Sequence, residues 1–352
     1  MMKAGYGDCF LIKLKTNKEK SFNVLVDSGT SLSYSVYNEK IINDFLDNNT
    51  LDLIIVTHCD DDHVKGFTRL FEKLLKDNTK REKVKRVIYN SPFAVAKYFS
   101  YPYEKLKKKV INTKSADTSA RSADTIQQKL FDLDLLEEQI IINDGKSNIS
   151  QDGIKITFLS PSLDELREFY GKYSEDKKRI KQKGADTKGK KLNKDYEFFI
   201  DDLKSNTTTE KLTEYNRASI AFFIEEEVTE NVVLMLGDSD YEIVRRKLES
   251  IPFSIDKKLK LNYLKLSHHG SICSLSKDFL DIIECNNYLV STDGCKYGHP
   301  DKKTLARIWN YNEDAIFYFN YEERIKAIFK NEPDYKYKMK CIGQRSFYGT
   351  RY

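Results

Sequence analysis

The stretch LDLIIVTHCDDDHVKG, residues 51–66, decides the fold. Its first half is an apolar run bounded by polar residues, which is typical of a strand buried on both faces. After the stretch, apolar residues recur at spacings of three and four, which indicates an amphipathic helix; they are Phe67, Leu70, Phe71, Leu74 and Leu75. Between strand and helix, positions 58–63 hold two histidines, three aspartates and a cysteine. The pattern predicts an α/β protein with a functional loop at this strand end.

Strand-like and helix-like segments continue to alternate along the chain. Further strands are predicted at residues 21–29, 85–90, 153–160, 218–226, 231–238, 261–269 and 287–294, and helices at 241–250 and 276–285. A layered α/β architecture follows from this order.

Some segments interrupt or end the alternation. Residues 95–135 are polar and are predicted to be helical, whereas residues 315–332 suggest a hairpin. Residues 165–212 are predicted to form a mobile basic insertion, because nine Lys or Arg lie between positions 177 and 194. The main domain is expected to span residues 1–330, and residues 331–352 to form a C-terminal extension. The more ordinary interpretation of the basic run at residues 177–194 is that it forms solvated surface.

The composition is that of a globular chain. Its 352 residues can bury a sizeable core, and a net charge of +5 does not by itself argue for nucleic acid. No apolar run approaches the roughly 18 residues of a membrane span, and the first residues do not resemble a signal peptide. The six cysteines form no CxxC pair. Reduced thiols and a cytoplasmic location are therefore expected.

All five histidines lie in short polar motifs that directly follow predicted strands. The motifs are THCDDDH at 57–63, LSHHGS at 266–271 and STDGCKYGHP at 291–300. Scattered structural histidines would show no such pattern. Imidazole and carboxylate are the ligands of Zn²⁺, Mn²⁺ or Fe sites that keep positions open for water and substrate. The sequence therefore predicts a metal site.

Alternate side chains at the end of a strand point the same way, so His58 and Asp60 are predicted to share one metal ion. Asp62 and His63 lie where the helix begins and are expected to face a second ion. Asp238 ends another predicted strand and is expected to bridge the two. The alternative for the aspartates is capping of the helix, which would not require flanking histidines.

The remaining histidines are expected to complete the site. One of His268 and His269 should bind metal, and the other is expected to contact substrate or orient a ligand. His299 is predicted to contact the scissile phosphate or to protonate the leaving group, unless it is a structural residue of its turn. Asp8 and Asp27 are expected to hold the metal-binding loop in place by hydrogen bonds.

Several further roles are assigned from the pattern. Asp62 is also predicted to be catalytic, by accepting a hydrogen bond from the attacking hydroxide and fixing its direction. Asn216 and Ser219 are candidates for binding substrate or the first metal ion; the alternative is a loop that satisfies its own backbone. Asp240 is expected to cap the following helix, and Cys59 to pack in the core.

Taken in order, these motifs resemble the metallo-β-lactamase superfamily of binuclear hydrolases. VLVDSG at 24–29 is similar to its first motif, THCDDDH to its HxHxDH signature, GDSD at 237–240 to its acidic bridging motif and SHHG at 267–270 to its late histidine motif. The resemblance covers roughly residues 4–330. It implies a four-layer αββα sandwich, in which two mixed sheets are flanked by helices.

Finer details resemble the hydrolase domain of ComEC-type competence DNA-uptake proteins, with GDC at 7–9, NRAS at 216–219 and YGHP at 297–300. Two departures matter. Asp60 stands where the superfamily signature usually has its second histidine, and this harder ligand makes Mn²⁺ as credible as Zn²⁺. No histidine lies between His63 and His268, so the third histidine of the first metal position is missing. The resemblance implies two divalent ions and leaves open whether the first position is weak, filled only with substrate, or empty.

Together these features predict a metal-dependent hydrolase, a phosphodiesterase or nuclease that uses a metal-bound hydroxide. Single-stranded DNA or RNA are candidate substrates. One alternative is hydrolysis of a small ester, lactone, thioester or lactam. Another, motivated by the missing histidine, is a binding or regulatory module with a degenerate site. The habits of the family add the expectation of a protein partner such as an ATPase; no membrane partner is expected, and the oligomeric state stays open.

Overall fold

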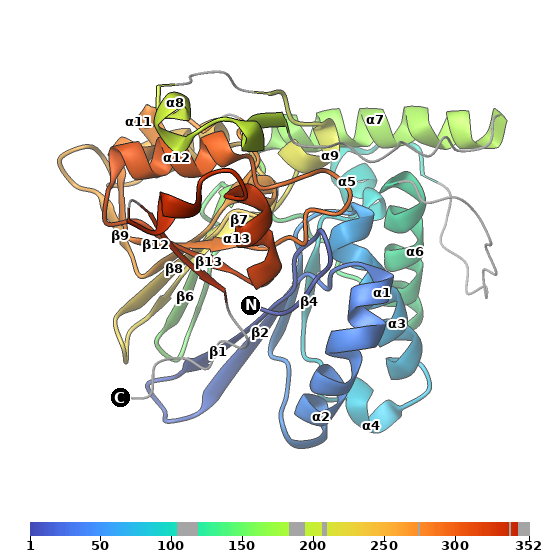
Figure 1. Ribbon diagram of the computed structural model, residues 1–352. Helices are drawn as coiled ribbons and strands as arrows, with labels where there is room; N and C mark the ends of the chain where they lie inside the picture. Colours follow the sequence, from blue (N-terminus) through green and yellow to red (C-terminus); the bar gives the residue numbers. More distant parts are fainter. Residues whose placement is uncertain (104–118, 183–193, 206–209, 274, 338, 344–352) are drawn as a thin grey trace.

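The computed structural model describes residues 1–103, 119–182, 194–205, 210–273, 275–337 and 339–343. Two mixed sheets pack face to face, and helices cover their outer faces (Figure 1). The four-layer αββα sandwich predicted from the sequence is confirmed.

The first sheet has the strand order β1-β2-β3-β4. Strand β1 (Phe10–Lys15) runs antiparallel to β2 (Ser21–Val26), whereas β3 (Leu53–Val56) and β4 (Val87–Tyr89) continue the sheet in parallel. The predicted strands at residues 21–29, 51–58 and 85–90 are therefore confirmed.

Strand β3 shows how the apolar run sets the layers. Leu53 and Ile55 pack between the two sheets, while Ile54 and Val56 pack against the outer helices. All four side chains are buried, because each face of the strand is covered. This explains why the run lacks the alternation of a half-exposed strand.

The second sheet has the order β14-β13-β12-β10-β8-β7-β6-β5, antiparallel from β5 to β8 and parallel from β8 to β14. Its strands are β5 (Ile149–Gln151), β6 (Ile154–Ser160), β7 (Ala221–Glu226), β8 (Asn231–Met235), β10 (Tyr263–Lys265), β12 (Asn287–Val290), β13 (Ile316–Phe319) and β14 (Lys340–Gly343). Strands β9 (Leu259–Leu261) and β11 (Ile283–Cys285) form a separate parallel pair.

The helices cover the outer faces of both sheets. In the first half of the chain they are α1 (Ser31–Ser33), α2 (Glu39–Asn48), α3 (Asp61–Leu74), α4 (Asn78–Arg81), α5 (Pro92–Phe99), α6 (Ser119–Asp132) and α7 (Leu163–Gln182), with a π-helical turn at Tyr34–Asn38. In the second half they are α8 (Ile200–Leu203), α9 (Glu214–Arg217), α10 (Tyr241–Ser250), α11 (Lys277–Asp281), α12 (Lys302–Tyr311) and α13 (Glu322–Ile328), with 3₁₀ turns at Lys194–Glu197, Ser267–Gly270 and Pro333–Tyr337. Side chains of α2, α3, α5, α6 and α7 pack on the first sheet, and those of α10 to α13 on the second.

Two predictions of local structure are wrong. The expected hairpin at residues 315–332 is strand β13 followed by helix α13, because Ile325 and Ile328, spaced by three, are both buried on one helical face. Of the expected helix at 276–285, only Lys277–Asp281 is helical; its last three residues form β11, which pairs with β9.

The first part of the expected basic insertion is helix α7, and it belongs to the core. Leu166, Phe169 and Tyr173 are buried in the same apolar cluster as α3 and α6. Residues 183–193 and 206–209 of the insertion lie outside the described residues. No helix in the described ranges is long and apolar enough to cross a bilayer.

Candidate metal centre

The polar motifs of the two sheets meet at one edge of the sandwich. His58 and Asp60 follow β3, and Asp62 and His63 lie in the first turn of α3. Asp238 lies in the loop between β8 and α10, and the adjacent histidines 268 and 269 follow β10. Because β8 and β10 are parallel neighbours, their carboxyl ends bring these loops together.

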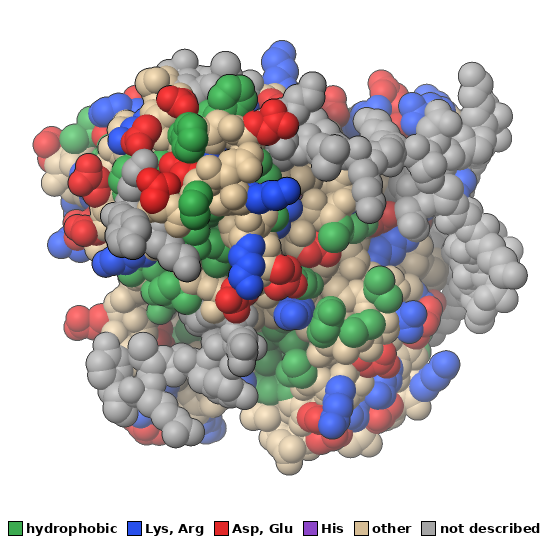
Figure 2. All heavy atoms as spheres, viewed as in Figure 1, with side chains coloured by type: hydrophobic (Ala, Val, Ile, Leu, Met, Phe, Trp, Pro, Cys, Tyr) green, Lys and Arg blue, Asp and Glu red, His purple; other side chains and the backbone are tan. Residues whose placement is uncertain are grey.

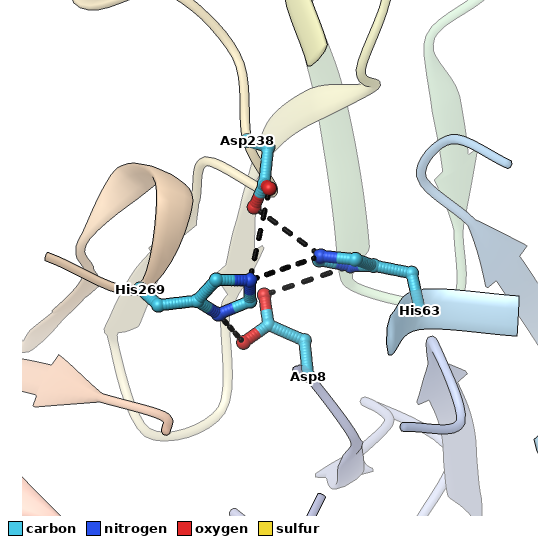
Figure 3. A group of neighbouring side chains, drawn as sticks. All are labelled: Asp8, His63, Asp238 and His269. Carbon is cyan, nitrogen blue, oxygen red and sulfur yellow. Dashed lines mark hydrogen bonds and ion pairs between the residues drawn. The ribbon is translucent and has the colours of Figure 1, made fainter. Parts of the chain in front are cut away.

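Asp8, His63, Asp238 and His269 form a buried group whose possible ligand atoms all lie within 4.8 Å of one another (Figure 3), and Asp62 adjoins this group. The Nε2 atoms of His63 and His269 are 3.3 Å apart, and His63 Nε2 lies 3.4 Å from Asp238 Oδ1. Asp62 Oδ2 lies 3.4 Å from His269 Nε2. Ligands of a tetrahedral zinc ion, each at about 2.0–2.1 Å from it, are about 3.3–3.4 Å from one another. The spacing therefore fits a single ion, and it places His269 in this group.

A second, looser group adjoins the first. His58 Nε2 lies 3.9 Å from Asp60 Oδ2 and 3.8 Å from Asp238 Oδ2. His268 Nε2 lies 3.9 Å from the same Asp238 oxygen. Asp238 thus borders both groups, with one oxygen toward His63 and the other toward His58. This is the position expected of a bridging carboxylate.

The histidine pair sits on an unusual backbone. His268 and His269 have φ of 47° and 57°, and such left-handed conformations are uncommon for residues other than glycine. Strain of this kind, on the order of 1–3 kcal/mol per residue, persists only where the surroundings enforce it. Here the turn directs both rings toward Asp238, since each Nε2 atom lies within 3.9 Å of its Oδ2.

Hydrogen bonds fix the orientation of the imidazole rings. His63 Nδ1 donates to Asp27 Oδ2 at 2.7 Å, and His269 Nδ1 donates to the Ser291 carbonyl at 3.0 Å. His58 Nδ1 lies 3.1 Å from the hydroxyl of Thr57, which itself donates to Asp27. In all three rings Nδ1 is held by the protein and Nε2 faces the group. This leaves the Nε2 lone pair for a metal ion.

The Asp8 carboxylate lies on the Nδ1 side of the histidine rings, away from the Nε2 atoms that face the metal centre. Its Oδ1 is 3.3 Å from His269 Nδ1 and its Oδ2 is 3.9 Å from His63 Nδ1. These are the outer ring nitrogens, and Figure 3 shows Asp8 across the two rings from Asp238. Its carboxylate is therefore placed to orient the histidines, while Asp62 faces their Nε2 side.

A buried lysine was missed in the sequence. Lys265 of β10 is fully buried, forms an ion pair with Asp8, donates to the Gly237 carbonyl at 2.9 Å and lies 3.8 Å from Asp238 Oδ1. It is the only charged residue in an otherwise apolar strand that leads directly into the histidine pair. A lysine in such a run could have been recognised as a buried partner of the carboxylates.

Other predicted residues are placed as follows. Ser219 is fully buried; its hydroxyl accepts from the Asp238 amide at 3.1 Å and lies 3.4 Å from His58 Nδ1. Asn216 is buried in α9 and accepts from the Thr213 hydroxyl. Substrate contact by either residue stays a prediction, because the contacts seen are internal.

The expectations for two neighbouring residues are confirmed. Asp240 caps α10 by accepting from the Glu242 amide at 2.8 Å, and Cys59 packs in the core. By contrast, Asp60 occupies the position before α3 without a side-chain capping bond, which argues against the capping alternative for this aspartate. His299 lies beside His268, with ring centroids 5.0 Å apart.

Burial and charge shift the pKa values of these groups in opposite directions. Burial lowers the pKa of His58 to about 4, and burial together with Asp62 raises the pKa of Asp60 to about 6. Although burial opposes a charged ring, Asp238 and Asp8 raise the pKa of His269 to about 9. The carboxylates of Asp238 and Asp27 likewise raise the pKa of His63 well above its usual value. Without metal, the looser group therefore has a neutral His58, and the tighter group carries protons on His63 and His269.

The residues present fit divalent cations. Buried His58 Nε2 and Asp238 Oδ1 have no hydrogen-bond partner among the described residues, a state that costs about 1–3 kcal/mol per group. A coordinated cation would satisfy both atoms. The mixed nitrogen and carboxylate donors suit Zn²⁺ or Mn²⁺. One ion would be held by Asp62, His63, Asp238 and His269, and a second by His58, Asp60 and Asp238.

Comparison with family models agrees with this geometry. Residues 2–112 match the model described as metallo-beta-lactamase superfamily. The match supports that superfamily for this chain. It covers β1 to α5, and with them the His58–His63 motif, which contributes candidate ligand atoms to both groups. Members of the superfamily are mostly metal-dependent hydrolases, and the match supports this class of activity. Comparison with curated proteins gives no match.

Lys265→Met is expected to destabilise the metal-free protein by about 3–5 kcal/mol, because it leaves the Asp8 carboxylate buried without its partner. Urea denaturation measures the change. The double variant Asp8→Asn/Lys265→Met should be less destabilised than Lys265→Met alone. Strictly additive losses would show that the two side chains do not interact.

Metal binding at pH 7 is expected to release on the order of two protons, because His63 and His269 must become neutral to act as ligands. Protons compete with the metal, so affinity should rise with pH through the range in which His269 titrates, at about 9. Calorimetric titration of the metal-free protein in buffers of different ionisation enthalpy gives the number released. Binding without proton release would contradict this picture of the metal-free site.

Proposed function

We propose that the protein is a metal-dependent phosphodiesterase. The observation that carries the proposal is the position of Asp238 between two groups of ligand atoms, with one oxygen 3.4 Å from His63 Nε2 and the other 3.8 Å from His58 Nε2. Two divalent ions bound there would lower the pKa of coordinated water and neutralise charge on the reacting oxygens.

The protein's own side chains supply orientation. Asp62 and Asp60 lie on the side of the histidine rings that faces the site, where a carboxylate can accept a hydrogen bond from a nucleophilic water. His299 lies next to His268, and in this proposal it donates a proton to the leaving oxygen. Asp27 and Asp8 hold the rings from behind, so the site is organised before substrate binds.

Two features favour a phosphodiester over a small ester or lactam. The looser group contains Asp60 in place of a histidine, and an oxygen-rich site suits the harder ions common in phosphoryl transfer. The GDC, NRAS and YGHP motifs also resemble those of the DNA-uptake branch. Surface charge contributes little, since acidic and basic side chains are interspersed over the face drawn in Figure 2.

The decisive experiment compares substrates and two adjacent aspartates. Purified protein loaded with Mn²⁺ or Zn²⁺ should hydrolyse bis(p-nitrophenyl) phosphate, with little activity on p-nitrophenyl acetate or a chromogenic lactam. Asp62→Asn should lower kcat/KM roughly 10²- to 10⁴-fold, because it removes a carboxylate that faces the reaction.

Asp61→Asn is the matched control. Asp61 belongs to the same motif, but its carboxylate accepts from Ser122 and lies 3.6 Å from Lys65. Its substitution should change kcat/KM by no more than about twofold. Equal losses in both variants, or turnover of the ester or lactam alone, would contradict the proposal. Absence of bound metal would favour a binding module.

A further inference from the structure

A row of rings connects the metal centre to the surface. The His299 ring lies 5.0 Å from His268 and 6.1 Å from Tyr297, measured between centroids. Tyr297 in turn meets Tyr6 edge to face, with centroids 5.7 Å apart at 87°. Tyr297 is 36% exposed, so the row ends at solvent.

A single ammonium group lies on the outer rings. Lys296 Nζ lies 4.8 Å from the centroid of Tyr6 and 4.9 Å from that of Tyr297, and 3.5 Å from the Tyr6 hydroxyl. Within the described part of the chain, no carboxylate comes within 4.0 Å of this nitrogen. The charge is held by aromatic faces and stays available to an anion.

Backbone contacts fix this group beside the metal centre. The Asp8 amide donates to the Asp62 carbonyl, and a Cβ added at Gly7 would lie 1.7 Å from that carbonyl oxygen. The chain at Tyr6, the residue before Gly7, therefore lies close to the backbone of Asp62. Only a glycine at position 7 allows the two segments to approach so closely.

The loop that carries Lys296 and Tyr297 is also held in place. Arg324 Nε donates to the His299 carbonyl at 2.8 Å, and Arg324 Nη2 donates to the Gly298 carbonyl. At the other end of the loop, the Asp293 amide donates to the Gly5 carbonyl at 2.8 Å. The backbone segments that carry Tyr6, Lys296 and Tyr297 are therefore held next to each other.

We propose that Tyr6, Lys296 and Tyr297 form a nucleotide-binding platform that presents a single-stranded nucleic acid to the metal centre. A base stacks on the exposed ring of Tyr297, and the Lys296 ammonium binds the phosphate of a neighbouring nucleotide. Aromatic faces combined with a cation are the means by which proteins bind single strands without reading sequence. A small ester or lactam has neither a base that could stack on Tyr297 nor a phosphate that could bind Lys296. The inference rests on the proposed phosphodiesterase function and names its substrate class.

The test measures binding separately from turnover. A fluorescein-labelled oligodeoxythymidine is titrated with protein in Ca²⁺ buffer, and affinity is read from fluorescence anisotropy. Tyr297→Ala is expected to weaken binding roughly 5- to 100-fold, whereas Tyr297→Phe, which keeps the ring, should stay within about twofold. Lys296→Gln should reduce the slope of log affinity against log salt by about 0.7, and Lys296→Arg should restore it.

Matched controls make the outcomes decisive. Tyr98, which is 52% exposed on α5, provides a tyrosine whose replacement by alanine should leave the affinity unchanged. Inorganic polyphosphate, which has no bases, should compete poorly with the oligonucleotide. Equal affinity of wild type, Tyr297→Ala and Lys296→Gln would overturn the platform, as would competition by polyphosphate at equal phosphate concentration.

Failure of this inference can be told apart from failure of the proposed function. If the wild-type protein hydrolyses bis(p-nitrophenyl) phosphate but the platform variants bind the oligonucleotide like wild type, only the platform is wrong. If the wild-type protein hydrolyses no phosphodiester, the proposed function is wrong, and the platform loses its basis with it.

Discussion

Carboxylates buried next to one another dominate the energetics of this protein. Asp8, Asp27, Asp62 and Asp238 are each no more than 6% exposed and lie around the same histidines. Like charges this close are unfavourable unless protons or cations lie between them. In the metal-free protein, Lys265 and protons on the histidines compensate the negative charge of these carboxylates. In a metal-loaded protein, the metal ions would compensate it. The closeness of these carboxylates also explains why the protein holds each imidazole ring by its outer nitrogen, Nδ1.

The site exists only when both sheets are in place. The first sheet contributes Asp8 from the segment before β1, and Asp27 and the His58–His63 motif from the segments after β2 and β3; the second contributes Asp238 and the histidine pair. Polar contacts cross between them; for example, the Ser219 hydroxyl, in the loop that follows α9, lies 3.4 Å from His58 Nδ1. Packing of the sandwich thus organises the ligands before any ion or substrate arrives, which is the condition for tight binding and efficient catalysis.

Much of this arrangement could be predicted from the chain, and the failures share a cause. Strand β3 and helix α3 follow from local apolar spacing, and the ligand motifs follow from histidines placed after strands. Contacts between distant segments could not be predicted from the sequence. They are the pairing of Lys265 with Asp8, the assignment of His269 to the tighter group, and the approach of Tyr6 to Tyr297. The hairpin predicted at residues 315–332 is wrong because β13 pairs with β12 and β14, not with the next segment.

The central claim is that Asp238 bridges two metal positions. Titration of the metal-free protein with Mn²⁺, followed by electron paramagnetic resonance, tests it directly. Two ions bridged at the roughly 3.5–4 Å typical of binuclear hydrolases should give an exchange-coupled signal at saturation. An isolated Mn²⁺ signal that saturates at one ion per chain would contradict the account, because the His58 group would then hold no ion.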